Sequence, residues 1–312
     1  MVWPLVDSLD PQKSPSSYSI AGVHDGMAPA PSHMIMRHSL FFTDVDRCLL
    51  DHHTSSYETA RPALEALRSE HVPVILVSGK TRAEIEPLRQ HLNHSDPFIV
   101  ENGAAVFVPI DTFDFPLERS RIRSAYRVIE LGTPYAMLRD VLRQIEEAIN
   151  TPLKGFGDLS PTDIMGATGL SHEDALRAKH REYDEPFLLE GPPRLVDAVR
   201  SQVEARGLRC TKSGRFFHLT GTNDSTRAVE ILLRSYRRMW EMDDAPEHLE
   251  TVGIGDSLED LPLLTTVNRA VLMQKPDGTY DPESNLPGLI RAPGIGAAGW
   301  NQAVLDLLKH AA

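Results

Sequence analysis

Short apolar runs alternate with amphipathic stretches from residue 37 onward. Residues 39–43, 72–77 and 98–100 are apolar runs of the length expected for buried strands. Residues 59–69 carry apolar side chains at helical spacing, and Thr81 has the sequence context of a helix cap. Strands that alternate with helices are typical of a parallel sheet covered on both faces. We therefore predict an α/β domain with its functional residues beyond the carboxyl ends of the strands.

The middle of the chain departs from this pattern. Helices are expected near 134–149, 161–168, 171–181 and 193–206, with an apolar segment at 186–189. The first pattern then returns, with strands at 251–254 and 270–272, a short helix at 258–264 and a last helix near 298–309. We predict a domain split in sequence into 37–110 and 214–312, with a smaller α/β unit, 111–213, inserted into it. Residues 1–36 are rich in Pro, Ser and Met and are expected to form a poorly ordered extension.

The composition excludes several classes of function. The 312 residues are 41% hydrophobic and 24% charged, which is ordinary for a globular protein. A formal charge of −12 argues against nucleic acid or an anionic membrane as partner. No apolar run reaches the roughly 18 residues that span a bilayer. Two cysteines exclude a disulfide scaffold and are consistent with a cytoplasmic location.

The first candidate for chemistry is Asp44–Val45–Asp46, which directly follows a predicted strand. Asp44 could attack a phosphorus atom as a nucleophile, and Asp46 could protonate the leaving oxygen and then activate water. The alternative is a loop that uses aspartates only as turn-forming residues.

A second acidic cluster and an anion site follow two other predicted strands. Asp256 and Asp260 are four residues apart, so both can face one side of a helical turn, and their hard oxygens suit Mg²⁺. The alternative is acidic capping of that helix. Ser78, Gly79 and Lys80 precede a helix, where a hydroxyl and helix N-terminal amides can bind phosphate. Two acidic clusters at one edge of a sheet indicate a catalytic metal site more specifically than either cluster alone.

Two glycine-containing segments resemble nucleotide-binding loops but do not fit them. The P-loop pattern requires a glycine where Val74 stands. Residues 294–299 match the dinucleotide string, but no strand is expected before them and only 13 residues follow. We predict a turn before the last helix there.

These motifs resemble the haloacid dehalogenase-like phosphatases, and longer strings resemble the mannosyl-3-phosphoglycerate phosphatases. The strings are Leu50–Asp51–His52–His53–Thr54, Ser78–Gly79–Lys80–Thr81–Arg82–Ala83–Glu84, Glu101–Asn102–Gly103, Gly155–Phe156–Gly157–Asp158, Arg181–Glu182–Tyr183–Asp184–Glu185–Pro186–Phe187 and Gln274–Lys275–Pro276–Asp277–Gly278. The similarity covers about 37–310. It implies a Rossmann-like core with an inserted α/β cap, and hydrolysis of mannosyl-3-phosphoglycerate to mannosylglycerate, a compatible solute. The glucosyl analogue is the substrate of related members.

The resemblance also implies roles for residues. Asp44 would be the nucleophile and Asp46 the general acid/base, and Ser78 would hold the phosphoryl oxygens. Mg²⁺ would be held by Asp44, the Asp46 carbonyl and Asp256, with Asp260 in support. Arg181 and Glu185 in the cap would contact the phosphorylated sugar acid. Lys212 is a further candidate for a substrate contact.

The chain departs from the family pattern at three positions. Arg47 stands where a glycine is usual, Glu259 where an asparagine is usual, and Ser225 where a lysine normally neutralises the nucleophile and phosphate. Arg227, Lys212 or Arg47 could supply the missing charge. Two alternatives therefore stay open, namely a catalytically weak protein that binds a phosphorylated sugar acid, and a phosphatase for another small phosphomonoester.

Overall fold

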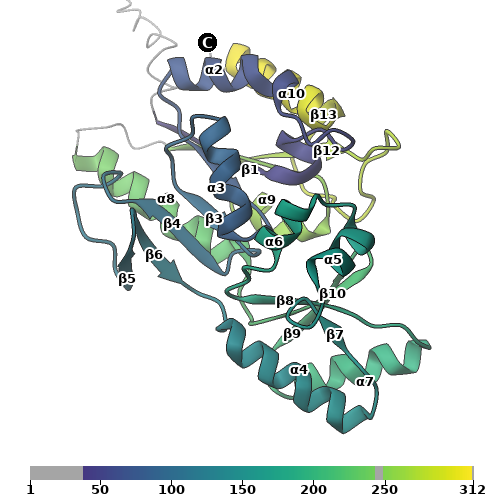
Figure 1. The fold of residues 1–312 in the computed structure, drawn as a ribbon. Coiled ribbons are helices and arrows are strands. Elements are labelled where there is room, and N and C mark those ends of the chain that lie inside the picture. The colour runs from purple at the N-terminus through teal and green to yellow at the C-terminus, as the bar shows by residue number, and fades with distance from the viewer. Residues whose placement is uncertain (1–37, 243–248, 311–312) are drawn as a thin grey trace, which may run out of the picture. The chain divides into compact units, whose positions relative to one another are not determined.

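The computed structural model of the chain describes residues 38–242 and 249–310, and its strands there form two sheets (Figure 1). The predicted extension 1–36 lies outside the described residues. The larger sheet contains, in spatial order, β13 (Ile290–Ile295), β12 (Arg269–Gln274), β11 (Glu250–Gly255), β1 (Ser39–Asp44), β2 (Val74–Val77), β3 (Phe98–Val100), β4 (Ala105–Pro109), β6 (Tyr126–Glu130) and β5 (Ser120–Arg123). The smaller sheet contains β7 (Lys154–Gly155), β8 (Asp184–Leu188), β10 (Phe216–Thr220) and β9 (Arg209–Ser213).

The larger sheet is mainly parallel. Neighbouring strands from β13 through β3 pair in parallel, and β4, β6 and β5 extend the sheet in antiparallel fashion. Parallel pairing places the carboxyl ends of β1, β2 and β11 at the same edge. The α/β class predicted from the alternating pattern is confirmed.

Helices cover both faces of the larger sheet. One face packs against α2 (Arg61–Ser69), α3 (Arg82–His91) and α10 (Gly296–His310), and the other against α8 (Ser225–Met242) and α9 (Leu261–Leu264). Short helical turns lie at η1 (Val45–Leu49), η2 (Glu58–Ala60) and η3 (Leu258–Asp260). Phe41 of β1 packs in the first core cluster, and its neighbours Leu40 and Phe42 pack in the second. This burial on both sides explains why β1 is an uninterrupted apolar run.

The smaller sheet has its own core. Its helices are α4 (Tyr135–Ile149), α5 (Pro161–Thr168), α6 (His172–Ala178) and α7 (Pro193–Glu204). Phe217 packs with α4 and α7, whereas Phe216 packs with α5 and α6, as strand alternation requires. We call residues 135–220 the cap and the remaining described residues the core. Figure 1 shows the cap elements grouped around the smaller sheet.

The boundaries of the insert differ from those predicted. Residues 111–213 were assigned to it, but β5 and β6 pair with the larger sheet and β10 lies inside the smaller one. Val128 and Ile129 of β6 pack in the two opposite core clusters of the larger sheet. The chain therefore completes an antiparallel hairpin of the core before it enters the cap.

The prediction that no strand precedes residues 294–299 was wrong. β13 pairs with β12 and runs directly into α10. A Cβ atom on Gly299 would lie 2.3 Å from the carbonyl oxygen of Gly294, so this close turn requires glycine. Among the described residues, α10 is the last element and no strand follows it.

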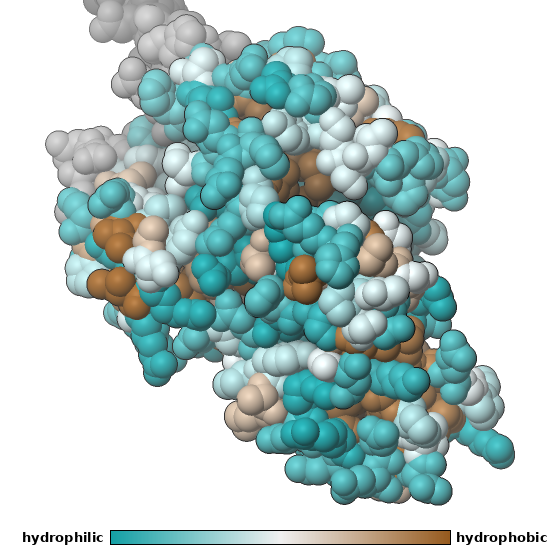
Figure 2. Space-filling model, viewed as in Figure 1, coloured by the Kyte–Doolittle hydropathy of each residue, from teal (hydrophilic) through white to brown (hydrophobic). Residues whose placement is uncertain are grey.

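The face of the molecule drawn in Figure 2 is mainly polar. Figure 2 shows hydrophilic residues over most of the visible face, with hydrophobic residues in small separate patches. Within 38–242 and 249–310, no helix combines the length and the hydropathy that crossing a bilayer demands.

Candidate active site at the carboxyl edge of the larger sheet

Asp44 is the last residue of β1 and begins a tight turn. Its partner in β2 is Val77, so Ser78 lies directly beyond the neighbouring strand. The turn continues through Asp46 to Arg47, whose φ of 62° lies in the left-handed region. A glycine adopts this conformation without strain, whereas an arginine does so at a cost. The turn places Asp44, Asp46 and Arg47 in the lining of one cavity.

Asp256 follows β11 on the other side of β1. Ligand atoms of Asp44, Cys48 and Asp256 lie within 4.8 Å of one another. Two carboxylates that are more than 200 residues apart in the chain thus meet at one edge of the sheet, as the sequence predicted.

Asp260, which was expected to support the metal site, lies in the turn that follows Asp256. Its Oδ2 accepts hydrogen bonds from the backbone N–H groups of Asp256 (2.9 Å) and Ser257 (3.1 Å) and from the Ser257 hydroxyl. Among the described residues, the group of close ligand atoms consists of Asp44, Cys48 and Asp256 and does not include Asp260. It fixes the turn that carries Asp256. A Cβ on Gly255 would lie 2.4 Å from the Asp260 Cβ, so glycine is needed beside it.

The acidic cluster is electrostatically costly without a cation. Burial and repulsion from other carboxylates, Asp260 first among them, raise the pKa of Asp44 well above its usual value, while Arg47 opposes the shift. Burial and the nearby Asp256 raise the pKa of Asp260 to about 6. Burial also raises the pKa of Asp256, against the influence of Arg47. A bound cation would favour the ionised forms.

The donor set fits Mg²⁺. This ion prefers hard oxygen ligands and usually binds through one or two carboxylates, keeping water in its other positions. Asp44 and Asp256 provide two carboxylates, and the Cys48 thiol is the third member of the group. Burial raises the pKa of Cys48 well above its usual value, and a sulfur ligand is softer than the oxygen ligands that Mg²⁺ prefers.

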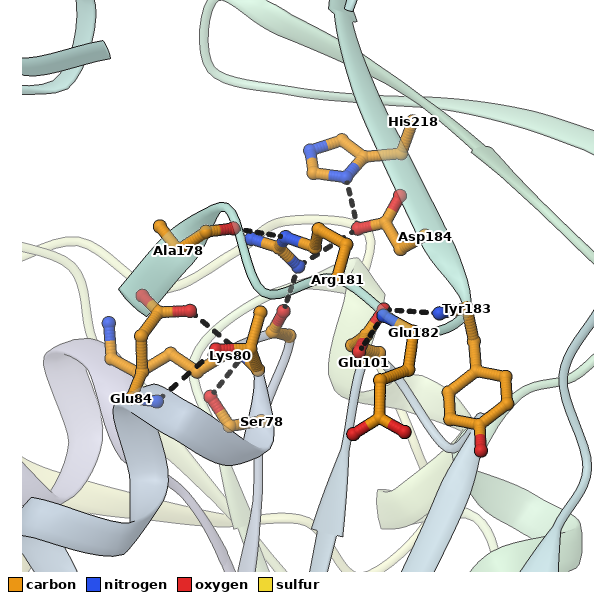
Figure 3. Close-up of polar contacts among 12 residues, drawn as sticks. Ser78, Lys80, Glu84, Glu101, Ala178, Arg181, Glu182, Tyr183, Asp184 and His218 are labelled. Carbon is orange, nitrogen blue, oxygen red and sulfur yellow. Dashed lines mark hydrogen bonds and ion pairs between the residues drawn. The ribbon is translucent and has the colours of Figure 1, made fainter. Parts of the chain in front are cut away.

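The predicted phosphate-binding residues lie beside Asp44. Ser78 is buried, and its hydroxyl oxygen accepts a hydrogen bond from the Lys80 N–H at 3.1 Å. Lys80 Nζ lies 2.9 Å from Asp46 Oδ1. Thr81 caps α3 in a reciprocal pair with Glu84, which confirms the cap expected there. Figure 3 shows Ser78, Lys80 and Glu84 together at this helix start.

A cavity of about 410 Å³, which we call the Asp44 cavity, lies between these core residues and the cap. Its lining includes Asp44, Asp46, Arg47, Gly79, Lys80, Asp256 and Asp260 from the core and Arg181, Thr211, Ser213 and His218 from the cap. A second cavity of about 320 Å³, the Ser225 cavity, is lined by Asp44, Ser78 and Ser225 among others. The core chemistry and the cap therefore face a common space.

Of the three predicted substrate contacts, Arg181 alone lines the Asp44 cavity. It donates to the Gly79 carbonyl at 2.8 Å and pairs with Asp184 Oδ2 at 3.2 Å. His218 Nδ1 lies 2.8 Å from the same Asp184 oxygen, and Figure 3 shows the three side chains together. Burial opposes protonation of His218, but the Asp184 carboxylate raises its pKa overall. Sequence reasoning missed His218, because a single histidine in a strand carries no motif.

The other two predicted substrate contacts are corrected. Glu185 is buried and pairs with Arg139 at 2.7 Å, so it holds the cap together. Lys212 lies over the ring of Phe217, 5.4 Å from its centroid, on the face of the smaller sheet that α4 and α7 cover. Its strand neighbours Thr211 and Ser213 line the Asp44 cavity instead. Consecutive residues of a strand point to opposite faces of the sheet, so a shift of one position along the strand moves a side chain to the other face.

Of the three residues that could supply the charge missing at Ser225, Arg47 alone lies near Asp44. Ser225 is buried at the start of α8, beside the Asp44 nucleophile candidate. Arg227 lines another cavity, with Phe115 and Ile231. Lys212 is on the wrong face. Arg47 remains beside Asp44 and Asp256.

Comparison with known proteins identifies the family of the chain. Residues 41–125 match the family model of haloacid dehalogenase-like hydrolases. A glucosyl-3-phosphoglycerate/mannosyl-3-phosphoglycerate phosphatase of Methanococcoides burtonii is 42% identical over 273 residues, covering 88% of this chain and 98% of that protein. A Persephonella marina protein of the same name is 36% identical over 87% of this chain and 97% of its own length. A mannosyl-3-phosphoglycerate phosphatase of Pyrococcus furiosus is 32% identical over 75% of this chain and 90% of its own length.

Solved structures share the fold at lower identity. A phosphatase of the haloalkanoate superfamily from Bacteroides thetaiotaomicron has a TM-score of 0.59 at 16% identity, covering 92% of this chain and 98% of that chain. A sugar phosphatase of subclass IIB has a TM-score of 0.56 at 15% identity, covering 87% of this chain and 98% of that chain. With the curated relatives, these findings establish that the chain belongs to the glucosyl-3-phosphoglycerate/mannosyl-3-phosphoglycerate phosphatase family of haloacid dehalogenase-like hydrolases, a family of phosphoric monoester hydrolases.

Proposed function

We propose that this protein is an Mg²⁺-dependent phosphatase that hydrolyses glucosyl- or mannosyl-3-phosphoglycerate to the glycosylglycerate and phosphate. The observation that carries the proposal is the meeting of Asp44 and Asp256, whose ligand atoms lie within 4.8 Å at the Asp44 cavity. The names of the curated relatives supply the substrate class.

The proposed reaction has two displacements. An Asp44 oxygen attacks phosphorus, the bond to the glycerate oxygen breaks, and Asp46 gives that oxygen a proton. Water then attacks the aspartyl-phosphate, Asp46 takes a proton from it, and phosphate leaves with Asp44 regenerated. Ser78, Gly79 and Lys80 hold the phosphoryl oxygens beside β1. Mg²⁺, held by Asp44, the Asp46 carbonyl and Asp256, would neutralise phosphoryl charge when bound.

The cap provides the rest of the site. Arg181, Thr211, Ser213 and His218 face the cavity from the side opposite Asp44, so they are placed to contact the sugar-acid part of the substrate. Arg181 and a protonated His218 offer positive charge for a glycerate carboxylate. Closure of the cap over the substrate would exclude water that competes with the attack of Asp44.

Phosphate release from a panel of phosphomonoesters tests this proposal. The native protein with Mg²⁺ should release phosphate from glucosyl- or mannosyl-3-phosphoglycerate faster than from other sugar phosphates. Asp44→Asn should reduce the rate by at least about 10³-fold, because the nucleophile is lost. Asp140→Asn removes an exposed carboxylate of the cap and should behave as the native protein. Pure, metal-replete protein that hydrolyses none of the panel would refute the proposal.

The alternative is a protein that binds the phosphorylated sugar acid with little turnover. The contact of Arg47 with Asp256 favours it, since it occupies a carboxylate that the metal requires. Binding of the sugar phosphate without release of phosphate would support this alternative, and rapid turnover would exclude it.

A further inference from the structure

Arg47 holds both oxygens of the Asp256 carboxylate. Its Nε lies 2.8 Å from Oδ2 and its Nη2 donates to Oδ1 at 3.1 Å. The Asp256 side chain is 3% exposed and that of Arg47 is 43% exposed, so the guanidinium approaches from the cavity side. A divalent ion on Asp256 needs at least one of these oxygens. The ion and the arginine therefore compete for one carboxylate.

The remaining cations of the Asp44 cavity have partners that metal binding leaves in place. Of the described residues that line it, three are lysine or arginine, namely Arg47, Lys80 and Arg181. Lys80 pairs with Asp46, and Arg181 holds Asp184 and the Gly79 carbonyl. Arg47 pairs with a carboxylate that would itself bind the metal, whereas Lys80 pairs with the Asp46 carboxylate and leaves the Asp46 carbonyl free, and the side chain of Arg47 is 43% exposed. The acids that line the cavity outnumber these three, so a phosphate dianion needs a further positive group there.

We propose that Arg47 is a phosphate-binding residue that the divalent ion releases from Asp256. This inference rests on the proposed function and adds a substrate contact to it. When the ion binds Asp256, the free guanidinium turns to the phosphoryl group beside Asp44, where its planar fork can donate two hydrogen bonds. The small side chain of Ser225, in the adjoining cavity, offers no charge of its own.

Titration calorimetry with Mg²⁺ alone tests the competition. Arg47→Ala should bind Mg²⁺ about tenfold more tightly than the native protein, because the competing guanidinium is gone. Arg47→Gly should do the same and also relieve the left-handed backbone, so it guards against a poorly folded alanine variant. Arg227→Ala is the matched control, since Arg227 lines a different cavity, and its Mg²⁺ affinity should equal that of the native protein.

Binding of inorganic phosphate at saturating Mg²⁺ tests whether the released Arg47 binds the phosphoryl group. Arg47→Ala should bind phosphate about tenfold more weakly than the native protein, and adding Ser225→Lys to it should restore most of the loss. Unchanged or weaker Mg²⁺ binding in Arg47→Ala, or unchanged phosphate binding, would overturn the inference. Both measurements are independent of turnover. If the native protein has no phosphatase activity but Arg47→Ala still changes the Mg²⁺ and phosphate affinities as expected, the proposed function is refuted and the role of Arg47 is retained.

Discussion

Asp260 affects the metal site through the backbone of Asp256. Its carboxylate accepts the N–H groups of Asp256 and Ser257 and the Ser257 hydroxyl, so it sets the direction in which the Asp256 side chain leaves the turn. Groups that orient a metal ligand commonly affect metal affinity without contact with the ion.

A pair of substitutions separates this role from direct ligation. Asp260→Ala removes the acceptor and should weaken Mg²⁺ binding by about 10- to 100-fold. Asp260→Asn keeps an acceptor oxygen at the same place and should lose much less. Calorimetric titration measures both. Equal and large losses in the two variants would identify the negative charge of Asp260, rather than its hydrogen bonds, as the important feature.

Residue contacts are also where sequence reasoning reached its limit. Asp44, Asp256 and Ser78 could be placed together because each follows an apolar strand, and parallel strands end at one edge. The roles of Lys212 and Glu185 could not be predicted, because the sequence does not show which face of the sheet their side chains point to or what packs against that face. The contact between Arg47 and Asp256 joins positions 209 residues apart and has no local signal.

At the level of elements, the start of α8 is held against the loop after β3 by a glycine. Gly103 has a φ of 89°, and a Cβ there would lie 2.3 Å from the Asp224 carbonyl oxygen. Asp224 precedes Ser225, the first residue of α8, so this close approach sets the wall of the Ser225 cavity.

Gly103→Ala should therefore destabilise the protein by about 2 kcal/mol or more, from backbone strain and the steric clash. Gly166→Ala is the matched control, because Gly166 is inside α5 with open space around its Cβ position. That change should stabilise the protein by about 0.5–1 kcal/mol. Chemical denaturation gives both values, and a neutral Gly103→Ala would show that α8 can shift without cost.

Most long elements could be predicted from periodicity, whereas the edges of both sheets could not. The strands around β1 and the helices α4, α5, α7 and α10 lie close to their predicted ranges. β5 and β9 have mostly exposed or half-buried residues and lack an apolar run. β13 contains Pro293 and Gly294, which are unusual inside a strand and obscured it. Because β5 was not recognised, the predicted insert begins too early.

At the level of the whole molecule, the side chain of Glu101 in the core is joined to the cap by two hydrogen bonds from backbone N–H groups. Its carboxylate accepts the N–H groups of Glu182 (2.9 Å) and Tyr183 (2.8 Å), as Figure 3 shows. Burial raises the pKa of Glu101 from 4.5 to about 7, with Arg181 opposing the shift.

This raised pKa makes stability depend on pH. Between pH 4.5 and 7 the folded protein retains a proton on Glu101 that the unfolded chain loses, so stability falls as the pH rises through this range. The contribution is at most about 3 kcal/mol. In Glu101→Gln this part of the slope should disappear, which denaturation at pH 5, 6 and 7.5 would reveal. Identical slopes in the two proteins would contradict the assignment.

The proposed function depends on the binding of one divalent ion by Asp44 and Asp256. Crystals soaked in Mn²⁺, an ion with similar oxygen ligands and a strong anomalous signal, test it most directly. We expect a single anomalous peak bonded to an oxygen of Asp44 and an oxygen of Asp256, with Arg47 displaced from Asp256. No peak between the two aspartates, or an ion bound to only one of them, would show that they do not share a metal ion.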